Sequence, residues 1–325
     1  MKAIRINQHG DASVLQLEDI PLPTPGLGEA LVRIKAAGIN FADIYQREGR
    51  RPTPIPYTPG REGAGIVEAI GEGVTEVKVG DRVAYAEGIG SYAEYNVVKS
   101  KLLIPLPSDM SFEQGAAFPL QGMTAHYLLH DFFRVKPNDT VLVHAAAGGV
   151  GLLLVQWLKH LGARVIGTVS TDEKAKIARE AGADEVILYT SQDFVEEAKK
   201  LTDGKGVDFI LDGVGKTTFT KDLEAIKARG CIILFGSSSG PSESLAPNSL
   251  QAKSISICSG SLVNHISTRE EMLKRAADIF AGVREGWLKF RIDHIFPLEQ
   301  AAEAQKALEG RKTIGKIVLK IGEQG

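Results

Sequence analysis

The feature that most constrains this chain is a glycine-rich turn between a strand pattern and a helix pattern. Residues 141–151 read VLVHAAAGGVG, an apolar run that leads into small residues. Small residues let backbone N–H groups approach a diphosphate, and the N-terminus of the following helix adds partial positive charge. Ala146 replaces the first glycine of the usual Gly-x-Gly-x-x-Gly pattern, so the turn needs support from its surroundings.

The sequence around the turn gives that support. From about Gly122 onward, strand and helix patterns alternate, which predicts a parallel sheet covered by helices on both faces. A tight turn that binds no dinucleotide is the alternative. The expected strands are 140–145, 164–169, 185–188, 207–211, 231–235 and 254–259, and the expected helices are 150–161, 173–181 and 194–201.

The two ends of the chain have a different character. The first third is rich in Gly and Pro, and its strand patterns at 30–37, 65–70 and 81–85 predict a small, mostly β domain. After about Thr268 we expect helices at 270–283 and 298–308 and strands at 291–296 and 316–320. The last strand does not fit easily into the parallel sheet, so we expect it to return to the first domain.

Composition narrows the functional classes. The 325 residues carry a formal net charge of −2, which gives no basic field for nucleic acid or for an acidic membrane. Cys231 and Cys258 lie in apolar runs and form no disulfide framework or zinc pattern, as is typical of a reducing compartment. We see neither a signal peptide nor a membrane-spanning run, and expect a cytoplasmic enzyme.

The end of the second strand indicates which dinucleotide is bound. An NAD site usually has Asp or Glu there, but in this chain the place falls on Val169 or Ser170, and Lys174 follows shortly after. An uncharged strand end beside a cation suits the 2′-phosphate of NADPH. Tyr189, at the end of the neighbouring third strand, is also uncharged. Asp172 and Glu173 count against this interpretation, and Lys174 could be an ordinary solvated lysine.

Six motifs occur together along the chain. They are GINFAD at 38–43, PGREGAG at 59–65, VGDRV at 79–83, GMTA at 122–125, HAAAGGVG at 144–151 and FGSSSG at 235–240. With them the chain resembles the zinc-free quinone oxidoreductase (zeta-crystallin-like) branch of the medium-chain dehydrogenase/reductase superfamily. The resemblance implies an α/β protein with a GroES-like, mostly β catalytic domain at 1–122 and 265–325. It also implies a doubly wound Rossmann domain at 123–264 that binds NADPH, and a homodimer formed through the edge strand at 254–259.

The same resemblance argues against a metal site. Zinc-dependent members have Cys and His where this chain has Asn40 and Arg61, and their third ligand would fall near Leu120 or Gln121. The cysteine-rich lobe that would follow 82–85 is short here and has no cysteine. We therefore expect no metal, since no thiolate or imidazole ligands converge.

The resemblance implies a set of cofactor-binding residues along the chain. These are Asn40, Phe41, Asp43 and Ile44 at the nicotinamide end, Thr124 near its ribose and the diphosphate, Ala147, Gly148, Gly149 and Val150 at the pyrophosphate, Ser170, Lys174, Tyr189 and Arg311 around the 2′-phosphate, Val214 on the adenosine side, and Phe235, Gly236, Ser237, Ser238, Leu262 and Val263 toward the nicotinamide ribose. Arg311 strengthens the expectation of NADPH, because guanidinium groups pair well with phosphate.

The implied reaction is reduction of a quinone, and Tyr45 and Asn40 are the catalytic candidates. Tyr45 would orient the acceptor oxygen or donate a proton, although an aromatic pocket wall is the alternative role. Relatives often have a second tyrosine where this chain reads GRRP at 49–52, and its absence leaves room for an acidic or larger acceptor. Asp43 is expected to be a structural, ionised surface carboxylate, and His144 a hydrogen-bonded core residue.

Two other functions remain open. The same fold and cofactor would serve a reductase of α,β-unsaturated aldehydes or ketones. A non-catalytic nucleotide- or RNA-binding protein is the alternative from another class. The near-neutral charge and the lack of interleaved basic and aromatic residues argue against strong RNA binding.

Overall fold

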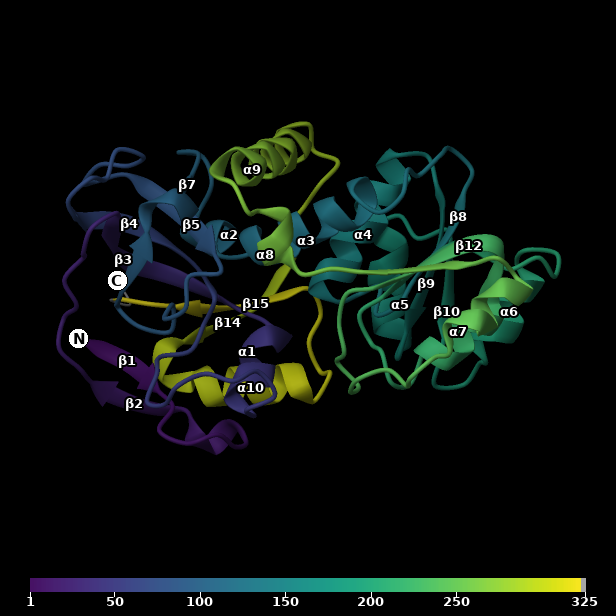
Figure 1. Ribbon diagram of the computed structural model, residues 1–325, viewed down its shortest axis with the longest axis horizontal. Helices are drawn as coiled ribbons and strands as arrows, with labels where there is room; N and C mark the ends of the chain where they lie inside the picture. The colour runs from purple at the N-terminus through teal and green to yellow at the C-terminus, as the bar shows by residue number, and fades with distance from the viewer. Residues whose placement is uncertain (323–325) are drawn as a thin grey trace. The chain divides into compact units, whose positions relative to one another are not determined.

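The computed structural model describes residues 1–322 (Figure 1). Contacts within the chain divide it into two compact units. Unit 1 consists of Met1–Met123, Ile266–Asp278 and the segment from Phe290 onward, and unit 2 consists of Thr124–His265 and Ile279–Lys289. The predicted Rossmann domain, 123–264, lies within one residue of the main segment of unit 2. Residues 279–289 belong to unit 2, whereas the prediction placed them in the catalytic domain. The domain boundaries stay a prediction, because contacts do not test whether each domain folds independently.

Unit 2 is built on a six-stranded parallel sheet with the order β10-β9-β8-β11-β12-β13. In sequence order this is 3-2-1-4-5-6, the doubly wound Rossmann arrangement, and the strand order reverses at β8 and β11. The strands are β8 (Thr140–Val143), β9 (Arg164–Val169), β10 (Glu185–Leu188), β11 (Val207–Asp212), β12 (Ile226–Leu234) and β13 (Ser256–Ser259). The parallel sheet predicted from the alternating patterns is confirmed.

Helices cover both faces of this sheet. One face carries α6 (Phe194–Lys200) and α7 (Phe219–Ala225), which pack on a buried layer formed by Leu142, Ile166, Ile187, Ile210 and Ile232. The right-handed crossover rule places α4 (Gly149–His160) and α5 (Asp172–Glu180) on the other face. Strands buried on both faces must be apolar throughout, which is why the sequence predicted them well.

His144 follows β8 and is buried, as the sequence predicted. Its Nδ1 lies 2.9 Å from Thr168 Oγ1, and its Nε2 lies 2.8 Å from Asp222 Oδ1. Burial disfavours the charged imidazole, but the attraction of the Asp222 carboxylate raises the pKa of His144 on balance. Burial in turn raises the pKa of Asp222 to about 7. The role of His144 as a hydrogen-bonded core residue is confirmed.

Unit 1 contains a seven-stranded sheet with the path β14-β15-β3-β4-β5-β7, and β6 also pairs with β3. The strands are β3 (Glu29–Ile39), β4 (Glu62–Ile70), β5 (Arg82–Ala86), β6 (Tyr95–Lys99), β7 (Ile104–Pro105), β14 (Ile292–Pro297) and β15 (Lys316–Lys320). Strands β1 (Lys2–Arg5) and β2 (Gln16–Asp19) form a separate pair. Strand β15 runs antiparallel to β3, with Ile317 opposite Ile39, so the expected return of the last strand is confirmed.

The helices of unit 1 are short. They are α1 (Phe41–Arg47), α2 (Phe112–Gly115) and α10 (Ala301–Glu309), while α3 (Pro119–His130) and α9 (Arg269–Arg284) continue from one unit into the other. Helix α1 was not predicted from the sequence, since seven residues are too few to show a helical period.

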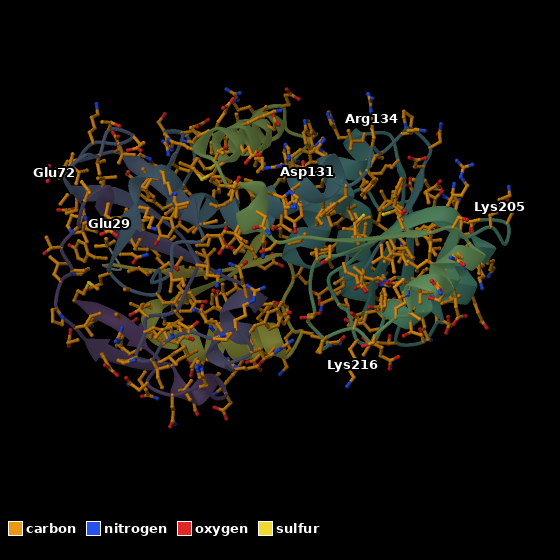
Figure 2. The ribbon with its side chains drawn as sticks, in the orientation of Figure 1. Glu29, Glu72, Asp131, Arg134, Lys205 and Lys216 are labelled. Atoms are coloured by element: carbon orange, nitrogen blue, oxygen red, sulfur yellow. The ribbon has the colours of Figure 1, made fainter. Side chains whose placement is uncertain are left out.

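Side chains of both charges project from the surface, as Glu72, Arg134 and Lys205 illustrate in Figure 2. Within residues 1–322, no helix has the length and apolar character needed to cross a bilayer.

Candidate functional site

The turn after β8 has the form that a diphosphate site requires. Ala145 adopts a left-handed φ of 50°, and the Gly148 N–H donates to Ala145 O at 2.8 Å. Helix α4 then begins at Gly149, with Gly148 as its N-cap residue. Backbone N–H groups in the first turn of a helix lack partners within the helix and carry the positive end of its dipole. The structure thus gathers Ala147, Gly149 and Val150 at one helix N-terminus.

The two key glycines of this turn have different reasons to be glycine. A Cβ on Gly151 would lie 2.3 Å from Ala145 O, so Gly151 is required for the helix to pack on the turn. A Cβ on Gly148 would lie 3.2 Å from the same oxygen, and the φ of Gly148 is an ordinary −78°. The fold itself therefore constrains Gly148 only mildly, and the missing side chain leaves open a cradle above the helix N-terminus. This cradle fits the diphosphate of a dinucleotide.

Three of the residues predicted to surround a 2′-phosphate lie near the ends of β9 and β10. The Tyr189 N–H donates to Val169 O at 3.1 Å, and Thr190 Oγ1 donates to Ser170 O at 3.1 Å. Lys174 lies in the first turn of α5, where its backbone N–H donates to the capping residue. Arg311 belongs to unit 1 and follows α10 with a φ of 54°.

Two loops at the same end of the sheet are joined by backbone hydrogen bonds, and a buried carboxylate that the sequence did not reveal holds the first of them. Asp212, the buried last residue of β11, accepts from the N–H groups of Val214 at 2.6 Å and Gly215 at 3.1 Å. The second loop closes on the first, because the Phe235 N–H donates to Asp212 O at 2.9 Å. The Ser238 N–H donates to Gly213 O at 3.2 Å. An Asp at the end of an apolar strand and before a Gly-rich loop was the available signal.

The remaining predicted residues are distributed as follows. Gly236 and Ser237 lie in the second loop, and a Cβ on Gly236 would lie 2.6 Å from Gly213 O. Short helix α8 (Leu262–His265) carries a buried Leu262 and a Val263 that is 49% exposed. Thr124 is buried in α3. The cofactor contacts of all these residues stay a prediction.

In unit 1, Asn40 belongs to a buried polar cluster. Its Nδ2 donates to Glu62 Oε2 at 2.9 Å, and its Oδ1 accepts from Lys316 Nζ at 2.9 Å. Lys316 and Glu62 also form an ion pair, and all three residues are at most 4% exposed. Glu62 Oε1 accepts from the Leu120 N–H at 2.7 Å, at the start of α3. Both ends of the Asn40 amide are thus held by protein groups, which gives Asn40 a fixed orientation.

The other two members of this cluster, Glu62 and Lys316, were not predicted from the sequence. Glu62 lies inside the quoted motif at 59–65, but it received no role there. Lys316 begins the KIVLK strand, where a lysine is easily taken for a surface residue. Their pairing spans 254 residues of sequence and leaves no local pattern. Among residues 1–322, no group of three or more His, Cys, Asp or Glu side chains is arranged so that it could hold a metal ion.

The expectation for Asp43 was wrong in one respect, because this carboxylate is not at the surface. Asp43 is 0% exposed, and its Oδ2 accepts from the Asn40 N–H at 2.9 Å and from Tyr92 OH at 3.0 Å. Burial raises the pKa of Asp43 to about 6, against the opposing effect of these hydrogen bonds. The polar residues Asn40 and Asp43 at the start of helix α1 point into the interior. Neither the helix nor this burial was predicted from the sequence.

Tyr45 lies on helix α1 and is largely buried. Its ring centroid is 6.2 Å from that of Phe41, and the Arg50 guanidinium carbon lies 4.2 Å from the Tyr45 centroid. Ile44 is buried in the interior. The predicted contacts of Asn40, Phe41, Asp43 and Ile44 with the nicotinamide stay a prediction.

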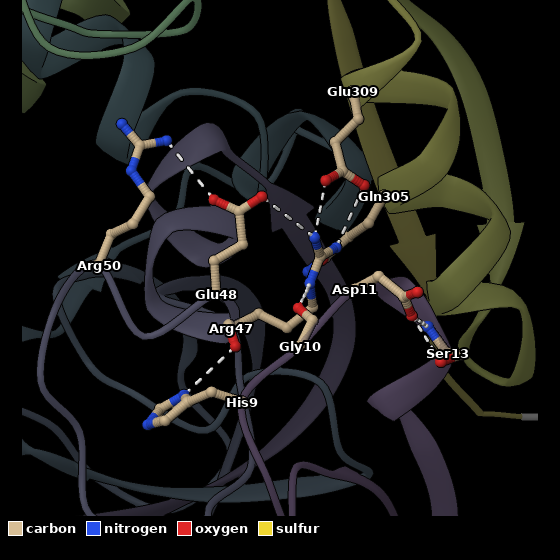
Figure 3. A network of polar contacts seen from close by, with 9 residues as sticks. All are labelled: His9, Gly10, Asp11, Ser13, Arg47, Glu48, Arg50, Gln305 and Glu309. Atoms are coloured by element: carbon tan, nitrogen blue, oxygen red, sulfur yellow. Dashed lines mark hydrogen bonds and ion pairs between the residues drawn. The ribbon is translucent and has the colours of Figure 1, made fainter.

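The other end of α1 is fixed by a second buried charge (Figure 3). Arg47 is 1% exposed, and its guanidinium donates to Gln305 Oε1 and Glu309 Oε1, each at 2.7 Å. Its Nε also donates to Gly10 O at 3.1 Å. Helix α1 is therefore anchored to α10 at one end and to the Asn40 cluster at the other.

Comparison with known proteins decides the family. Residues 26–108 match the alcohol dehydrogenase GroES-like domain, and residues 149–278 match the zinc-binding dehydrogenase family. A quinone oxidoreductase of Pseudomonas aeruginosa is 41% identical over 321 residues, with 98% of this chain and 99% of that protein covered. This chain belongs to the quinone oxidoreductase family of medium-chain dehydrogenases/reductases. The GroES-like and Rossmann-type architecture expected from the sequence is confirmed.

Other members of the quinone oxidoreductase family are equally similar. The solved structure of the Escherichia coli quinone oxidoreductase in complex with NADPH has a TM-score of 0.96 at 40% identity and covers 98% of this chain and 100% of that chain. A mycobacterial structure, also complexed with NADPH, has a TM-score of 0.95 at 43% identity with the same two coverages. A 2-haloacrylate reductase of a Burkholderia species is 40% identical and covers 97% of both chains.

A substitution at Gly148 tests the diphosphate cradle. Gly148→Val should abolish binding of NADPH and NADH without unfolding the protein, because the added carbons occupy the cradle while the backbone keeps its ordinary φ. Isothermal titration calorimetry measures the binding, and circular dichroism checks the fold. The matched change Gly151→Ala should instead lower the melting temperature, since its Cβ would meet a backbone oxygen. Normal nucleotide binding by Gly148→Val would contradict the proposed location.

The buried Asp43 predicts a dependence of stability on pH. The ordinary pKa of an aspartate is 3.8, and that of Asp43 in the folded protein is about 6. Between these values only the unfolded chain releases the proton, so the free energy of unfolding falls as pH rises from about 4 to about 6. Asp43→Asn should remove this pH-dependent loss of stability. Above about pH 7, the free energy of unfolding of the variant should exceed that of the wild type by up to about 3 kcal/mol.

Urea unfolding at a series of pH values measures this difference. The exposed Asp109→Asn serves as the control, and its curve should run parallel to that of the wild type. Parallel curves for Asp43→Asn and the wild type would show that Asp43 does not titrate as the structure indicates.

Proposed function

We propose that this protein is an NADPH-dependent quinone reductase that works without a metal ion. The observation that carries the proposal is the open cradle at Gly148, on the first crossover of a sheet with Rossmann strand order. The Escherichia coli and mycobacterial relatives that are complexed with NADPH support the choice of cofactor.

Each part of the proposed site has a task in binding the cofactor. Backbone N–H groups of Gly149 and Val150 bind the diphosphate at the helix N-terminus. Ser170 and Lys174 receive the 2′-phosphate, and the loop around Val214 holds the adenosine side. When bound, the nicotinamide supplies a hydride to an electrophilic acceptor.

Helix α1 and the residue before it provide the acceptor-binding part of the site. Tyr45 orients the acceptor oxygen or donates a proton, and Asn40 keeps the start of the helix in place through Glu62 and Lys316. A quinone accepts hydride readily and needs less electrophilic activation than a ketone, so a metal ion is not required. Arg61, which stands where zinc-dependent relatives have His, is paired with Glu87.

A second candidate function is the reduction of α,β-unsaturated aldehydes or ketones. It would use the same hydride delivery to a conjugated acceptor. The relative named a 2-haloacrylate reductase, at 40% identity over nearly the whole chain, favours keeping this candidate.

The assembly and location belong to the same proposal. Strand β13 is an outer strand of the six-stranded sheet, and pairing of two β13 strands would form a homodimer. A small-molecule acceptor is the expected partner of the site. The cytoplasmic location stays a prediction from the cysteine content.

Oxidation of NADPH under anaerobic conditions tests the activity. We expect turnover with a panel of neutral benzoquinones and naphthoquinones, and higher kcat/KM than with a panel of enals and enones. Loss of absorbance at the NADPH band measures the rate. Turnover with the enone panel alone would favour the second candidate, and no turnover with either panel would overturn both.

The cofactor preference has its own test at Lys174. NADPH should bind at least about tenfold more tightly than NADH, since one phosphate contact contributes about 1.4 kcal/mol. Lys174→Ala should remove most of this difference in calorimetric titrations and leave the affinity for NADH unchanged. The exposed Lys176→Ala, on the same helix, is the matched control. Equal affinities of the wild type for both nucleotides would contradict the role of Lys174.

A further inference from the structure

We infer that Cys231 and Cys258 form a peroxide-sensitive thiol pair, and that their reversible oxidation to a disulfide cross-links the outer strand β13 to β12. The chain has two cysteines in all, and both are free thiols in the structure. No other thiol of the same chain can therefore compete for either partner. The inference does not depend on the proposed function, since neither cysteine belongs to the proposed cofactor or acceptor site.

The two sulfur atoms already lie in contact. Cys231 Sγ on β12 is 3.7 Å from Cys258 Sγ on β13. These strands run parallel, with Cys231 opposite Ser256 and Cys258 opposite Ile233. Side chains two positions apart on a strand share one face of the sheet, so both thiols stand on the same face. A disulfide bond is about 2.0 Å long, so small rotations of the two side chains must bring the sulfur atoms about 1.7 Å closer.

The surroundings of the two thiols predict the order in which they react. Cys231 is 8% exposed, and burial, followed by the neighbouring Cys258 sulfur, raises the pKa of its thiol. Cys258 lies on the outer strand and is partly exposed. Oxidants attack the more accessible thiol with the greater thiolate fraction. Peroxide therefore reacts first with Cys258, and Cys231 closes the disulfide.

The oxidation is a balanced two-electron reaction. Hydrogen peroxide transfers one oxygen atom to Cys258, whose thiol becomes a sulfenic acid, and the rest of the peroxide leaves as water. The Cys231 sulfur then forms a bond to the Cys258 sulfur, and the Cys231 proton goes to the departing hydroxide, which leaves as a second water. Two thiols are thus oxidised to one disulfide while peroxide is reduced to two water molecules. A dithiol reductant reverses the reaction.

A cross-link at this place acts on an outer strand with little support. Strand β13 has four residues, and β12 is its single partner strand in the described part of the chain. The disulfide would close a segment of 27 positions and so restrict the unfolded chain, which stabilises the folded sheet. Pairing with a second copy would use the backbone at the outer edge of β13. The thiols stand on a face of the sheet, so the cross-link is compatible with that pairing.

Thiol counting after oxidation tests the pair. The full chain is treated with a molar excess of hydrogen peroxide, unfolded, labelled with N-ethylmaleimide and weighed by intact mass spectrometry. We expect both labels to be lost together, a mass lower by two hydrogen atoms, and recovery of both thiols with dithiothreitol. A non-reducing digest should contain the peptide pair joined at Cys231 and Cys258. Two labelled thiols after the treatment, or a cross-link between chains alone, would overturn the inference.

Two serine variants test the order of reaction. In Cys231→Ser the sulfenic acid of Cys258 lacks a thiol partner in its chain, so dimedone should trap it in far higher yield than in the wild type. Cys258→Ser should lose its remaining thiol at least about tenfold more slowly than Cys231→Ser, because burial shields Cys231. Equal rates for the two variants would show that Cys258 is not the first thiol to react.

The effect on β13 has a separate measurement. The oxidised wild type should melt at least about 3 °C above the reduced protein, as followed by circular dichroism. Cys258→Ser, treated with peroxide in the same way, is the matched control and should show no such rise, which accounts for oxidation of other side chains. A disulfide that forms without raising the melting temperature would overturn the proposed support of β13.

Discussion

The ion pair between Lys316 and Glu62 is the constraint on which much of unit 1 depends. Buried charges are costly unless they are paired and hydrogen-bonded, and here every partner comes from a different part of the chain. Asn40 follows β3, Glu62 begins β4, Lys316 begins β15, and the Leu120 N–H belongs to the start of α3. β4 and β15 must therefore meet before either charge is compensated, and all four segments must meet before both charged groups have their full set of hydrogen bonds. Gly38 is part of the same requirement, since a Cβ there would lie 2.3 Å from Glu62 Oε2.

Much of the fold could be predicted because it depends on local patterns. The strands at 164–169, 185–188 and 316–320 have the predicted bounds, since buried strands must be apolar and are ended by charged residues or turns. The phosphate turn was recognised because its small residues lie between a strand and a helix. Helix α1 was missed because its seven residues are too few to show a helical period and because its capping partner Asp43 looks like an ordinary exposed carboxylate.

The site was predictable only where a single segment forms it. The cradle at Gly148 is such a case, and its location follows from the motif alone. The partners of Asn40, the backbone bonds that join the loops after β11 and β12, and the Asp222 partner of His144 are contacts between segments far apart in sequence. Such polar pairs have no period and no characteristic spacing, so a single sequence does not show which charges will be buried together.

The return of β15 to β3 has a consequence for the order of events during synthesis. Residues 124–289, which include all of unit 2, are synthesised before β15 at 316–320. Most of the nucleotide-binding sheet can therefore form while β3, whose partners β4 and β6 are already made, still lacks β15. The end of β3 at Ala36–Ile39, which pairs with β15, stays unpaired until then, and an unpaired strand edge is prone to aggregation. A nascent chain of this enzyme thus has a period of vulnerability that ends only with its last strand.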